Sequence, residues 1–419
     1  MLHHVPQSRC KTTKSSFRIT KMAPDIAHLI EEVRIQTSSF DKNTEKDRQD
    51  LLRSARKLVH ELESPAEKVC RMIYLDTSIW VSVRILVDLG VFEQLVAVNG
   101  PVTAKELAKS SNADPRLVER FLKFIAVENF VQETGPDEYA ANDVTRVIAS
   151  DDGAGAITDM YTMFAVYADW PAFLKETRYA NPIDKDKSAF KYAYKTDHHY
   201  FDFISQPGNE ERLKNFMGHM RFKTLGLKWF EEPKIIEAVF GDEGVGKEDV
   251  LLVDVGGSTG YDILNFHQTH ADISGRLVLQ DLPATIHNLD KTALAEKGIE
   301  ALPHDFFTPE PIQHAKAYYL KMILHDWPDE QCKQILTNLM PALKPGYSRI
   351  LLNEIVVPDF KAGWFETSVD VLMMEVHSAQ ERREKEWRQL VESVEGLKVR
   401  KIWDVEGAVE KIIEIERVS

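Results

Sequence analysis

The spacing of apolar residues divides the chain into a helical first half and a second half in which strands alternate with helices. From Ile26 to about Val98, apolar residues recur at the spacing of amphipathic helices, as in LLRSARKLVHELESP. Residues 154–240 keep a helical pattern and are rich in aromatic side chains. From residue 241 onward, short apolar runs alternate with helical segments, as in LLVDVGG followed by YDILNFHQTH. This alternation predicts an α/β fold with a mostly parallel sheet of about seven strands, covered by helices on both faces.

The segment that follows residue 100 has the outline of a winged helix. It predicts a short helix, a turn at residues 112–115, a second helix and a β-hairpin that turns at residues 135–137. The face of the second helix that is expected to be buried carries Leu117, Phe121, Leu122 and Ile125.

A winged helix can bind DNA, so this segment leaves two interpretations open. Its second helix, in DPRLVERFLKFIAVE, has three bases and three acids, which is a poor balance for binding phosphates. The whole chain carries a net charge of −14, which disfavours nucleic acids and anionic membranes as partners. We therefore expect a packing or dimerisation module and keep DNA binding as the weaker alternative.

Length and composition are typical of a globular protein of two or three domains, with 419 residues, 43% of them hydrophobic and 28% charged. No apolar run approaches the roughly 18 residues of a membrane span. The three cysteines, Cys10, Cys70 and Cys332, are far apart and odd in number, which argues against a disulfide framework or a cysteine zinc site. This cysteine usage indicates a reducing compartment, and we expect a cytoplasmic location.

Residues 1–21 contain five basic residues and no acid, a composition shared with mitochondrial leaders. Pro6 and scattered apolar residues give this stretch no clean amphipathic face, which favours Met22 as the native start. The predicted organisation is a basic leader that is disordered or not native (1–25), a helical and winged-helix dimerisation domain (26–153), a helical substrate-pocket region (154–240) and a catalytic domain (241–419).

Candidate chemistry gathers where the strands of the second half end. DVGGSTG, residues 254–260, follows the first strand, and its glycines let the backbone approach a ligand closely; its spacing is neither GxGxxG nor a GK[ST] phosphate loop. Asp281 ends the second strand, where an acid can accept both hydroxyls of a ribose or simply cap a turn. Asp305 ends the third strand, where it can bind an exocyclic amine while Phe306 flanks the base. Together these strand ends indicate an adenosyl group at the carboxyl edge of the sheet.

The run YLKMILHDWPDE, residues 319–330, predicts a fourth strand from which His325 emerges at the same edge. A neutral imidazole is well suited to take a proton from a weakly acidic hydroxyl near pH 7. A histidine at a strand end can equally bond a backbone carbonyl, so the residues alone leave both roles open. We expect Asp326 to cap the helix that starts near Pro328, and Trp327 to serve in packing.

Taken in order, DVGGSTG, QDLP, HDFF, LKMILHDWPDE, NEIVVP and the ER of QERREKEW resemble the caffeic acid O-methyltransferase-like family. The resemblance covers about residues 60–419 and is strongest over residues 250–395. It implies a Rossmann-like class I methyltransferase domain, an N-terminal domain that forms a homodimer, S-adenosyl-L-methionine as cofactor, and no metal. Many fungal members act on aromatic polyketides or related natural products, so the implied reaction is methyl transfer to a hydroxyl, most simply a phenol, of a small aromatic metabolite.

The resemblance also assigns roles to single positions. His325 matches the family's general base, and Glu354 and Glu381 match the two acids that flank and orient it. The positions that match cofactor contacts are Asp254, Gly256, Gly257, Gly260, Asp281, Leu282, Asp305, Phe306 and Lys321. Ser258 replaces a glycine that is common in the loop, and a residue this small still allows close approach.

The acceptor stays open at this level. Glu375 and His377 occupy a variable pocket segment, and the aromatic and methionine residues nearby can belong to the core or line a cleft for a flat ring. The candidates for substrate contacts are Met163, Phe164, Trp170, Phe173, Phe216, Met220, Met322 and Met374. Some fungal relatives keep the cofactor pocket but catalyse a dehydration or a pericyclic rearrangement, which is the alternative function.

Overall fold

The computed structural model describes residues 23–41, 44–222, 228–241 and 245–418. The chain divides between Trp80 and Val81 into two compact units. The basic leader expected over residues 1–25 lies almost entirely outside the described residues. Among the described residues, no helix combines the length and the apolar character needed to cross a bilayer.

The first unit is helical, as the spacing from Ile26 onward predicts. Its elements are α1 (Ala23–Ser38), α2 (Glu45–Leu62), α3 (Pro65–Cys70), the π-helix η1 (Arg71–Asp76) and the first residues of α4 (Thr77–Asp88). α3 begins in a capping box, in which Ser64 accepts from the backbone of Glu67 and Glu67 accepts from the backbone of Ser64.

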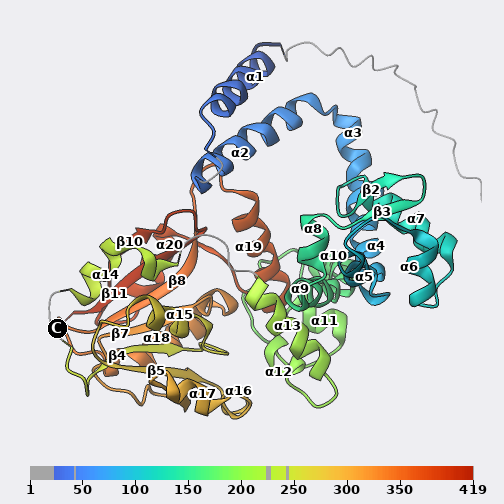
Figure 1. Cartoon of the computed structure of the whole chain (residues 1–419). Helices are drawn as coiled ribbons and strands as arrows, with labels where there is room; N and C mark the ends of the chain where they lie inside the picture. The colour runs from blue at the N-terminus through green and yellow to red at the C-terminus, as the bar shows by residue number, and fades with distance from the viewer. Residues whose placement is uncertain (1–22, 42–43, 223–227, 242–244, 419) are drawn as a thin grey trace, which may run out of the picture. The chain divides into compact units, whose positions relative to one another are not determined.

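The second unit opens with the winged helix (Figure 1). Its elements are α5 (Val91–Val98), β1 (Val102–Thr103), α6 (Ala104–Ser110), α7 (Pro115–Ala126), β2 (Gln132–Gly135), β3 (Glu138–Ala140) and α8 (Asp143–Ile148). The three strands form an antiparallel sheet in the order β1-β3-β2. The hairpin turns at residues 135–137 as expected, with Asp137 in the left-handed region at φ 59°.

The buried face of α7 differs by one position from the prediction. Leu117 is 42% exposed, and Val118 lies in the core with Leu122 and Ile125. The helix starts at Pro115, after the N-cap Asp114, and positions 118, 122 and 125 share one of its faces. Leu117 is one residue before Val118, a rotation of about 100° around the helix axis, and therefore lies at the edge of that face. The expectation for Leu117 is therefore wrong.

Five helices follow the winged helix and build an aromatic-rich layer. They are α9 (Asp151–Tyr161), α10 (Met163–Glu176), α11 (Ala189–Tyr194), α12 (Tyr200–Ile204) and α13 (Glu210–Phe222). Their core joins residues of α10, α11 and α12 to Val376 of α19 (Trp364–His377). The layer is thereby tied to a helix that comes much later in the chain.

The rest of the chain forms the predicted sheet and its covering helices. The strands are β4 (Val250–Val255), β5 (Arg276–Asp281), β6 (Ile299–Pro303), β7 (Ala317–Lys321), β8 (Arg349–Val357), β9 (Arg382–Arg383), β10 (Leu397–Asp404) and β11 (Glu410–Arg417). Their order is β10-β11-β8-β7-β4-β5-β6, and β9 pairs with β8. The pairs from β8 to β6 are parallel, whereas β10 and β11 form an antiparallel hairpin that pairs antiparallel to β8.

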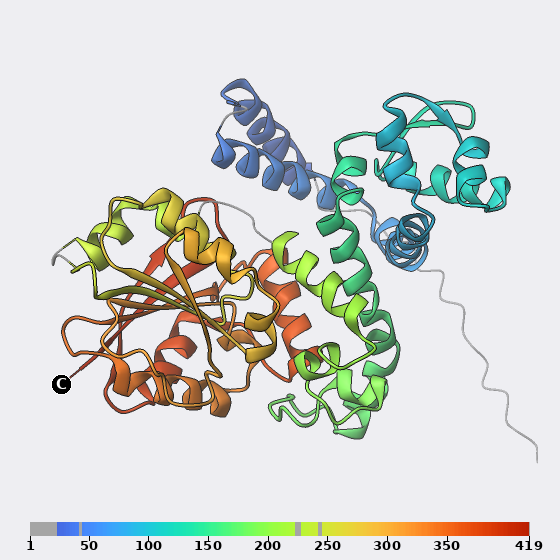
Figure 2. The same ribbon diagram turned by 60° about the horizontal axis from the view of Figure 1, so that its bottom comes forward.

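Helices cover both faces of this sheet, as Figure 2 shows. The covering helices and short helical turns are η2 (Trp229–Glu231), α14 (Pro233–Phe240), α15 (Tyr261–Thr269), α16 (Pro283–His287), α17 (Lys291–Glu296), α18 (Asp329–Leu339), η4 (Met340–Ala342) and α20 (Glu384–Glu392). Alternate residues of one strand enter separate cores: Tyr318 and Leu320 pack with α18 and α20, whereas Tyr319 packs with α14 and α15. This two-faced burial explains why the strands read as continuous apolar runs.

The predicted fourth strand is shorter than the apolar run that suggested it. β7 ends at Lys321, Met322 turns into the left-handed region at φ 51°, and His325 lies on the short 3₁₀ turn η3 (Leu324–Asp326). The N–H group of Met322 still donates to the carbonyl of Asn353 on β8, but the following two, of Ile323 and Leu324, donate to the Glu354 carboxylate. The buried carboxylate of Glu354 thus takes the place of the next backbone hydrogen bonds between β7 and β8.

Candidate active site

The glycine loop after β4 is held close to its neighbours. Gly256 has φ +72°, and a Cβ there would lie 2.8 Å from Cδ1 of Ile323; a Cβ on Gly257 would lie 2.5 Å from the Asp254 carboxylate. The N–H groups of Gly256 and Gly257 both donate to the carbonyl of Gln280, at 2.8 and 3.0 Å. The loop therefore packs too closely against Ile323 and Asp254 to admit a side chain at either glycine.

Buried acids with unused acceptor atoms lie beside this loop. Asp254 is 2% exposed, and its Oδ2 has no hydrogen-bond partner among the described residues. Burial, and then the neighbouring Asp262, raises the pKa of Asp254 well above its ordinary value. Asp262 Oδ2 accepts from the Tyr319 hydroxyl and pairs with the Lys321 ammonium, each at 2.9 Å, while its Oδ1 is unpartnered within the described part of the chain. These acceptors fit a cationic ligand rich in N–H donors.

Asp262 was not singled out from the sequence. Its position in the first turn of the helix that follows the glycine loop is the signal that could have identified it. Lys321, predicted as a cofactor contact, is held by this same carboxylate.

The next two acids lie at the ends of adjacent strands: Asp281 is the last residue of β5, and Asp305 follows the end of β6 by two residues. Asp281 accepts from the N–H of Ser258 and of Leu282, each at 2.8 Å, which fixes its carboxylate against the glycine loop. The backbone carbonyl of Asp281 also accepts a hydrogen bond from the backbone N–H of His304, so the segment that contains Asp305 is held at the same edge of the sheet. Leu282 is 46% exposed.

Phe306 completes this group of cofactor candidates. Its ring lies 3.7 Å from the place a Cβ would take on Gly256, while Asp305 accepts from the N–H of Phe307 at 2.9 Å. The structure thus brings the predicted residues of three strand ends together around one glycine loop. Ser258 adopts φ +53°, a conformation that glycine reaches more easily, which accounts for a small residue there.

The imidazole of His325 is buried and held by a carboxylate. Nδ1 lies 2.6 Å from Oε1 of Glu381, and both side chains are almost fully buried. Glu354 lies nearby, but its Oε1 accepts from the backbone N–H groups of Ile323 and Leu324, at 3.0 and 2.7 Å. Burial raises the pKa of Glu354 to about 7, against the opposing effect of His325. Glu381 therefore orients the ring, and Glu354 fixes the turn that carries it.

Asp326 does not cap the following helix. The N-cap position of α18 is Pro328, and the cap makes no side-chain hydrogen bond. Instead, Oδ1 of Asp326 lies 3.5 Å from Nε2 of His325 and 3.5 Å from Nε2 of His377. The turn η3 places this carboxylate beside the two imidazoles, so the capping expectation is wrong.

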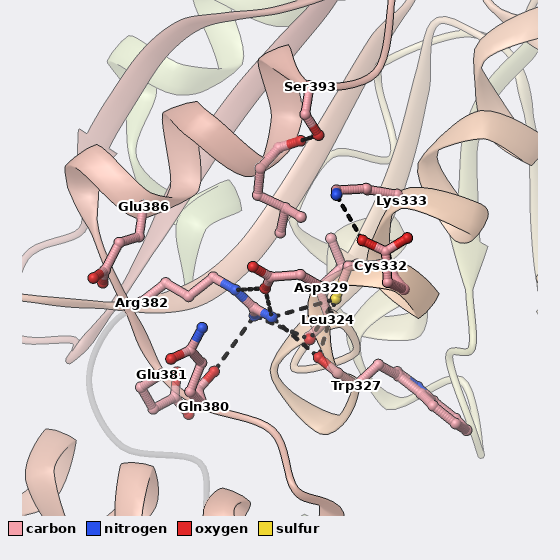
Figure 3. A network of polar contacts seen from close by, with 12 residues as sticks. Leu324, Trp327, Asp329, Cys332, Lys333, Gln380, Glu381, Arg382, Glu386 and Ser393 are labelled. Carbon is pink, nitrogen blue, oxygen red and sulfur yellow. Dashed lines mark hydrogen bonds and ion pairs between the residues drawn. The ribbon is translucent and has the colours of Figure 1, made fainter. Parts of the chain in front are cut away.

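Arg382 ties the turn to the segment that carries Glu381 (Figure 3). Its guanidinium donates to the carbonyls of Leu324 and Trp327, at 3.2 and 3.0 Å, on either side of the His325–Asp326 pair. Asp329 holds the guanidinium through two bonds, at 3.0 and 2.7 Å, and the Cys332 thiol donates to the same two carbonyls. Sequence reasoning noted Arg382 only as part of a motif, because its partners lie some fifty residues earlier in the chain.

One group of residues in the described part of the chain has the arrangement of a metal site. Ligand atoms of His325, Glu354 and Glu381 lie within 4.8 Å of one another, which sequence reasoning did not foresee. Oε1 of each carboxylate is already engaged, one by two backbone N–H groups and the other by the imidazole. Both of these carboxylate oxygens are therefore already occupied by hydrogen bonds.

The predicted substrate contacts fall into different surroundings. Met163 and Phe173 are core residues, with Trp170 and Phe216 packed against that core. Met322 packs against a neighbouring cluster beneath α19, and Met220 is 37% exposed. For Met163 and Phe173 the packing role thus prevails; Phe164 and Met374 are half-buried.

Glu375 is a buried acid that faces this helical layer. It is 1% exposed, and burial raises its pKa to about 8. Its charge in turn contributes to the raised pKa of Tyr167 on α10. Oε2 of Glu375 and Nε1 of Trp170 are buried with no hydrogen-bond partner among the described residues. At neutral pH Glu375 is therefore mostly an uncharged carboxylic acid.

A parallel sheet with this glycine loop, these strand-end acids and a carboxylate-held histidine defines a methyltransferase. Family models agree: residues 247–396 match the O-methyltransferase domain, and residues 79–151 match the O-methyltransferase dimerisation domain. The chain is 35% identical over 407 residues to the methyltransferase cfoC of Aspergillus candidus, covering 96% of this chain and 99% of that one. It is 36% identical to the demethylsterigmatocystin 6-O-methyltransferase of Aspergillus parasiticus, over 75% of this chain and 79% of that one.

The chain belongs to the O-methyltransferase family, which confirms the resemblance that its motifs carry. It is an S-adenosylmethionine-dependent O-methyltransferase. Among solved structures, it is similar to LepI in complex with S-adenosylmethionine, with a TM-score of 0.83 and 29% identity over 94% of this chain and 99% of that one. A structure described as a pericyclic reaction enzyme has a TM-score of 0.84 at 29% identity and the same coverage.

Replacing Gly256 by Ala should weaken cofactor binding. The new Cβ would lie 2.8 Å from Ile323 and force the loop away from it, so affinity for S-adenosylhomocysteine should fall about tenfold, which corresponds to about 1.4 kcal/mol. Gly298→Ala is the matched control, since it has φ +70° and no atom within 4 Å of the added Cβ. Calorimetry that finds equal affinities for the two variants would contradict the close approach.

Replacing Arg382 by Met should lower turnover while cofactor affinity stays near that of the wild type. Loss of the two carbonyl contacts frees the η3 turn, and a displacement of about 1 Å at a reacting group can cost on the order of 10²-fold. Arg383→Met, at a neighbour whose side chain is 51% exposed, should leave turnover unchanged. Partial recovery of the Arg382 variant by added guanidinium ion would separate positioning from lost stability. Unchanged turnover would show that the turn holds its shape without this side chain.

Replacing Glu375 by Gln should stabilise the protein at alkaline pH. The folded state raises the pKa of this acid from 4.5 to about 8, so its contribution is full below pH 4.5 and is lost as the pH rises through about 8. Gln resembles the protonated acid and has no such loss. Urea midpoints should therefore diverge in favour of the variant as the pH rises from about 4.5 to about 8, and the difference should stay constant above that. Glu395→Gln, at an exposed glutamate, is the control, and its urea midpoints should not diverge from those of the wild type. If the midpoints of Glu375→Gln and the wild type had the same pH dependence, the buried, uncharged state of Glu375 would be refuted.

Proposed function

We propose that the chain methylates a phenolic hydroxyl of a small aromatic natural product, with His325 as general base. The observation that carries this proposal is the 2.6 Å contact between Glu381 and Nδ1 of His325 at the edge of the sheet that holds the cofactor residues. A carboxylate at Nδ1 fixes the tautomer in which Nδ1 carries the proton and Nε2 has a free lone pair.

The cofactor supplies an electrophilic methyl group on a sulfonium. Nε2 of His325 would take the proton of the acceptor hydroxyl, so that the oxygen could accept that methyl group while S-adenosylhomocysteine leaves. Glu381 stabilises the imidazolium that forms, and the Asp326 carboxylate, 3.5 Å from Nε2, adds a second negative charge. Glu354 keeps the backbone of the turn in place throughout.

Positioning accounts for much of the expected rate. Holding two reactants in near-attack geometry can lower a barrier by roughly 7–11 kcal/mol, whereas a general base adds about 10²- to 10⁴-fold. The three contacts that fix the turn, from Glu354, Glu381 and Arg382, suit this requirement. No metal enters this scheme.

Several features support an aromatic acceptor and a homodimer. The layer of α9 to α13 is rich in aromatic rings, and one relative is named for O-methylation of demethylsterigmatocystin. The match to a dimerisation domain at residues 79–151 supports a homodimer and an end near residue 153 for the proposed N-terminal domain of residues 26–153. We propose residues 154–240 as the pocket region and residues 241–419 as the catalytic domain. Cys70 and Cys332, both free thiols, agree with the proposed reducing, cytoplasmic location.

A rearrangement is the second candidate function. The similarity to a structure described as a pericyclic reaction enzyme favours it. Against it stands the complete set of His325, Glu354 and Glu381, which a reaction without proton removal from a hydroxyl would not require.

Release of S-adenosylhomocysteine in the presence of candidate phenols tests the proposal. His325→Ala should lower that rate about 10²- to 10⁴-fold, with cofactor affinity near wild type. His287→Ala, at an exposed histidine, should have no effect. Full turnover in the His325 variant would refute the base assignment, and conversion of a substrate without S-adenosylhomocysteine release would favour the rearrangement. Activity should persist in excess chelator.

A further inference from the structure

A pair of histidines lies beside the proposed base. His377 ends α19, and His199 precedes α12 in the aromatic layer. Nδ1 of His377 lies 3.2 Å from Nε2 of His199, and Nε2 of His377 lies 3.5 Å from the Asp326 oxygen that is also 3.5 Å from His325. One carboxylate thus links the base to the pair.

Flat rings frame the pair. The indole of Trp327 stacks on the His199 ring, with centroids 4.5 Å apart and an interplanar angle of 11°. Phe201 stacks on His377 at 5.1 Å and 27°, and Tyr200 meets His377 edge-on. Trp327 is also in contact with Phe307 and Phe306, the second of which is beside the glycine loop. The pair therefore lies between the proposed base and aromatic side chains suited to a planar ligand.

Both rings are uncharged near neutral pH. Burial, assisted by Lys191 and Lys185, lowers the pKa of His199 to about 4. Burial, and then the neighbouring His199 and His325, lowers the pKa of His377 well below its ordinary value. Each ring then has one N–H group and one lone pair.

The Asp326 carboxylate determines which nitrogen has the lone pair. In its ionised form it only accepts, and its Oδ1 lies 3.5 Å from Nε2 of both His325 and His377. His325 already directs its one proton, on Nδ1, to Glu381, so His377 is the ring that has its Nε2–H toward Asp326 and its lone pair on Nδ1. His199 must then donate through Nε2, which leaves its own Nδ1 as an acceptor. That nitrogen is buried and has no partner within the described part of the chain.

We propose that Nδ1 of His199 is a substrate-binding atom that accepts a hydrogen bond from a second O–H or N–H group on the acceptor molecule. This inference rests on the proposed function and narrows its substrate class to planar aromatic acceptors with a donor besides the hydroxyl that is methylated. An unsatisfied buried acceptor is costly, and a ligand donor removes that cost. His377 and Asp326 act as positioning residues, because they fix the tautomer of His199.

Two substitutions at His199 separate its two nitrogens. A glutamine amide can take the place of Nε2, so His199→Gln keeps a donor toward His377 and loses the proposed acceptor. An asparagine amide can take the place of Nδ1, so His199→Asn keeps the acceptor and loses the bond to His377. Thermal unfolding of both variants measures whether they remain folded.

The first experiment needs no substrate. Nitrogen NMR of histidine-labelled protein measures which ring nitrogen has the proton, and the His199 variants serve to assign the signals. Without acceptor, His199 should be protonated at Nε2 and unprotonated at Nδ1. A proton on Nδ1 would overturn the inference, whatever the proposed function turns out to be.

The second experiment measures binding of naphthol and of isomeric dihydroxynaphthalenes to protein loaded with S-adenosylhomocysteine. The isomer that reaches His199 should bind about 10- to 100-fold more tightly than naphthol. His199→Gln should abolish that preference and leave naphthol affinity unchanged, whereas His199→Asn should keep part of it.

The outcomes separate the two claims. Equal preferences in wild type and His199→Gln, with naphthol bound by both, would reject the second binding atom and leave the aromatic acceptor intact. Failure of every naphthol to bind would contradict the aromatic acceptor itself, and the inference would fall with it.

Discussion

The active site depends on the early end of β7. The apolar run that contains β7 could have continued as a strand through His325. Instead, the carboxylate of Glu354 accepts hydrogen bonds from the N–H groups of Ile323 and Leu324, and the chain turns out of the sheet there. Without that turn, the imidazole would be one more side chain above the sheet. With it, the ring meets Glu381, and Asp326 becomes a neighbour of two histidines.

Charged groups buried around one short turn carry a cost that the fold offsets through hydrogen bonds. Glu354 accepts hydrogen bonds from the N–H groups at the start of η3. Arg382 donates to the carbonyls of Leu324 and Trp327, which flank His325 and Asp326. Removal of one member would leave the other as a buried charge without its partner, which is far costlier than loss of a surface pair. These hydrogen bonds hold the turn in its observed shape, which the proposed role of His325 as a base requires.

Local patterns in the sequence were sufficient for the sheet, the glycine loop and the acids at strand ends. Apolar runs bounded by Gly and Asp fix where β4 and β5 end, and parallel strands then bring Asp254, Asp281 and Asp305 to one edge. Features that depend on distant segments could not be read in this way. Nothing near Asp326 indicates that it faces a histidine of α19, and His199 and His377 are separated by 178 positions in sequence. Leu117 was misplaced for a smaller reason, because it lies at the edge of the apolar face of α7, whose centre is formed by Val118, Leu122 and Ile125.

The place of β11 has a consequence for how the protein is made. This strand follows all the other described strands of the sheet in sequence, yet it lies between β10 and β8, the strand that contains Glu354. While the chain is still on the ribosome, β8 has an unpaired backbone edge and the buried partner of Arg349, Glu414, does not yet exist. The sheet can therefore be completed only after the final hairpin has been made, and until then the unpaired edge of β8, the strand that contains Glu354, can pair with another strand.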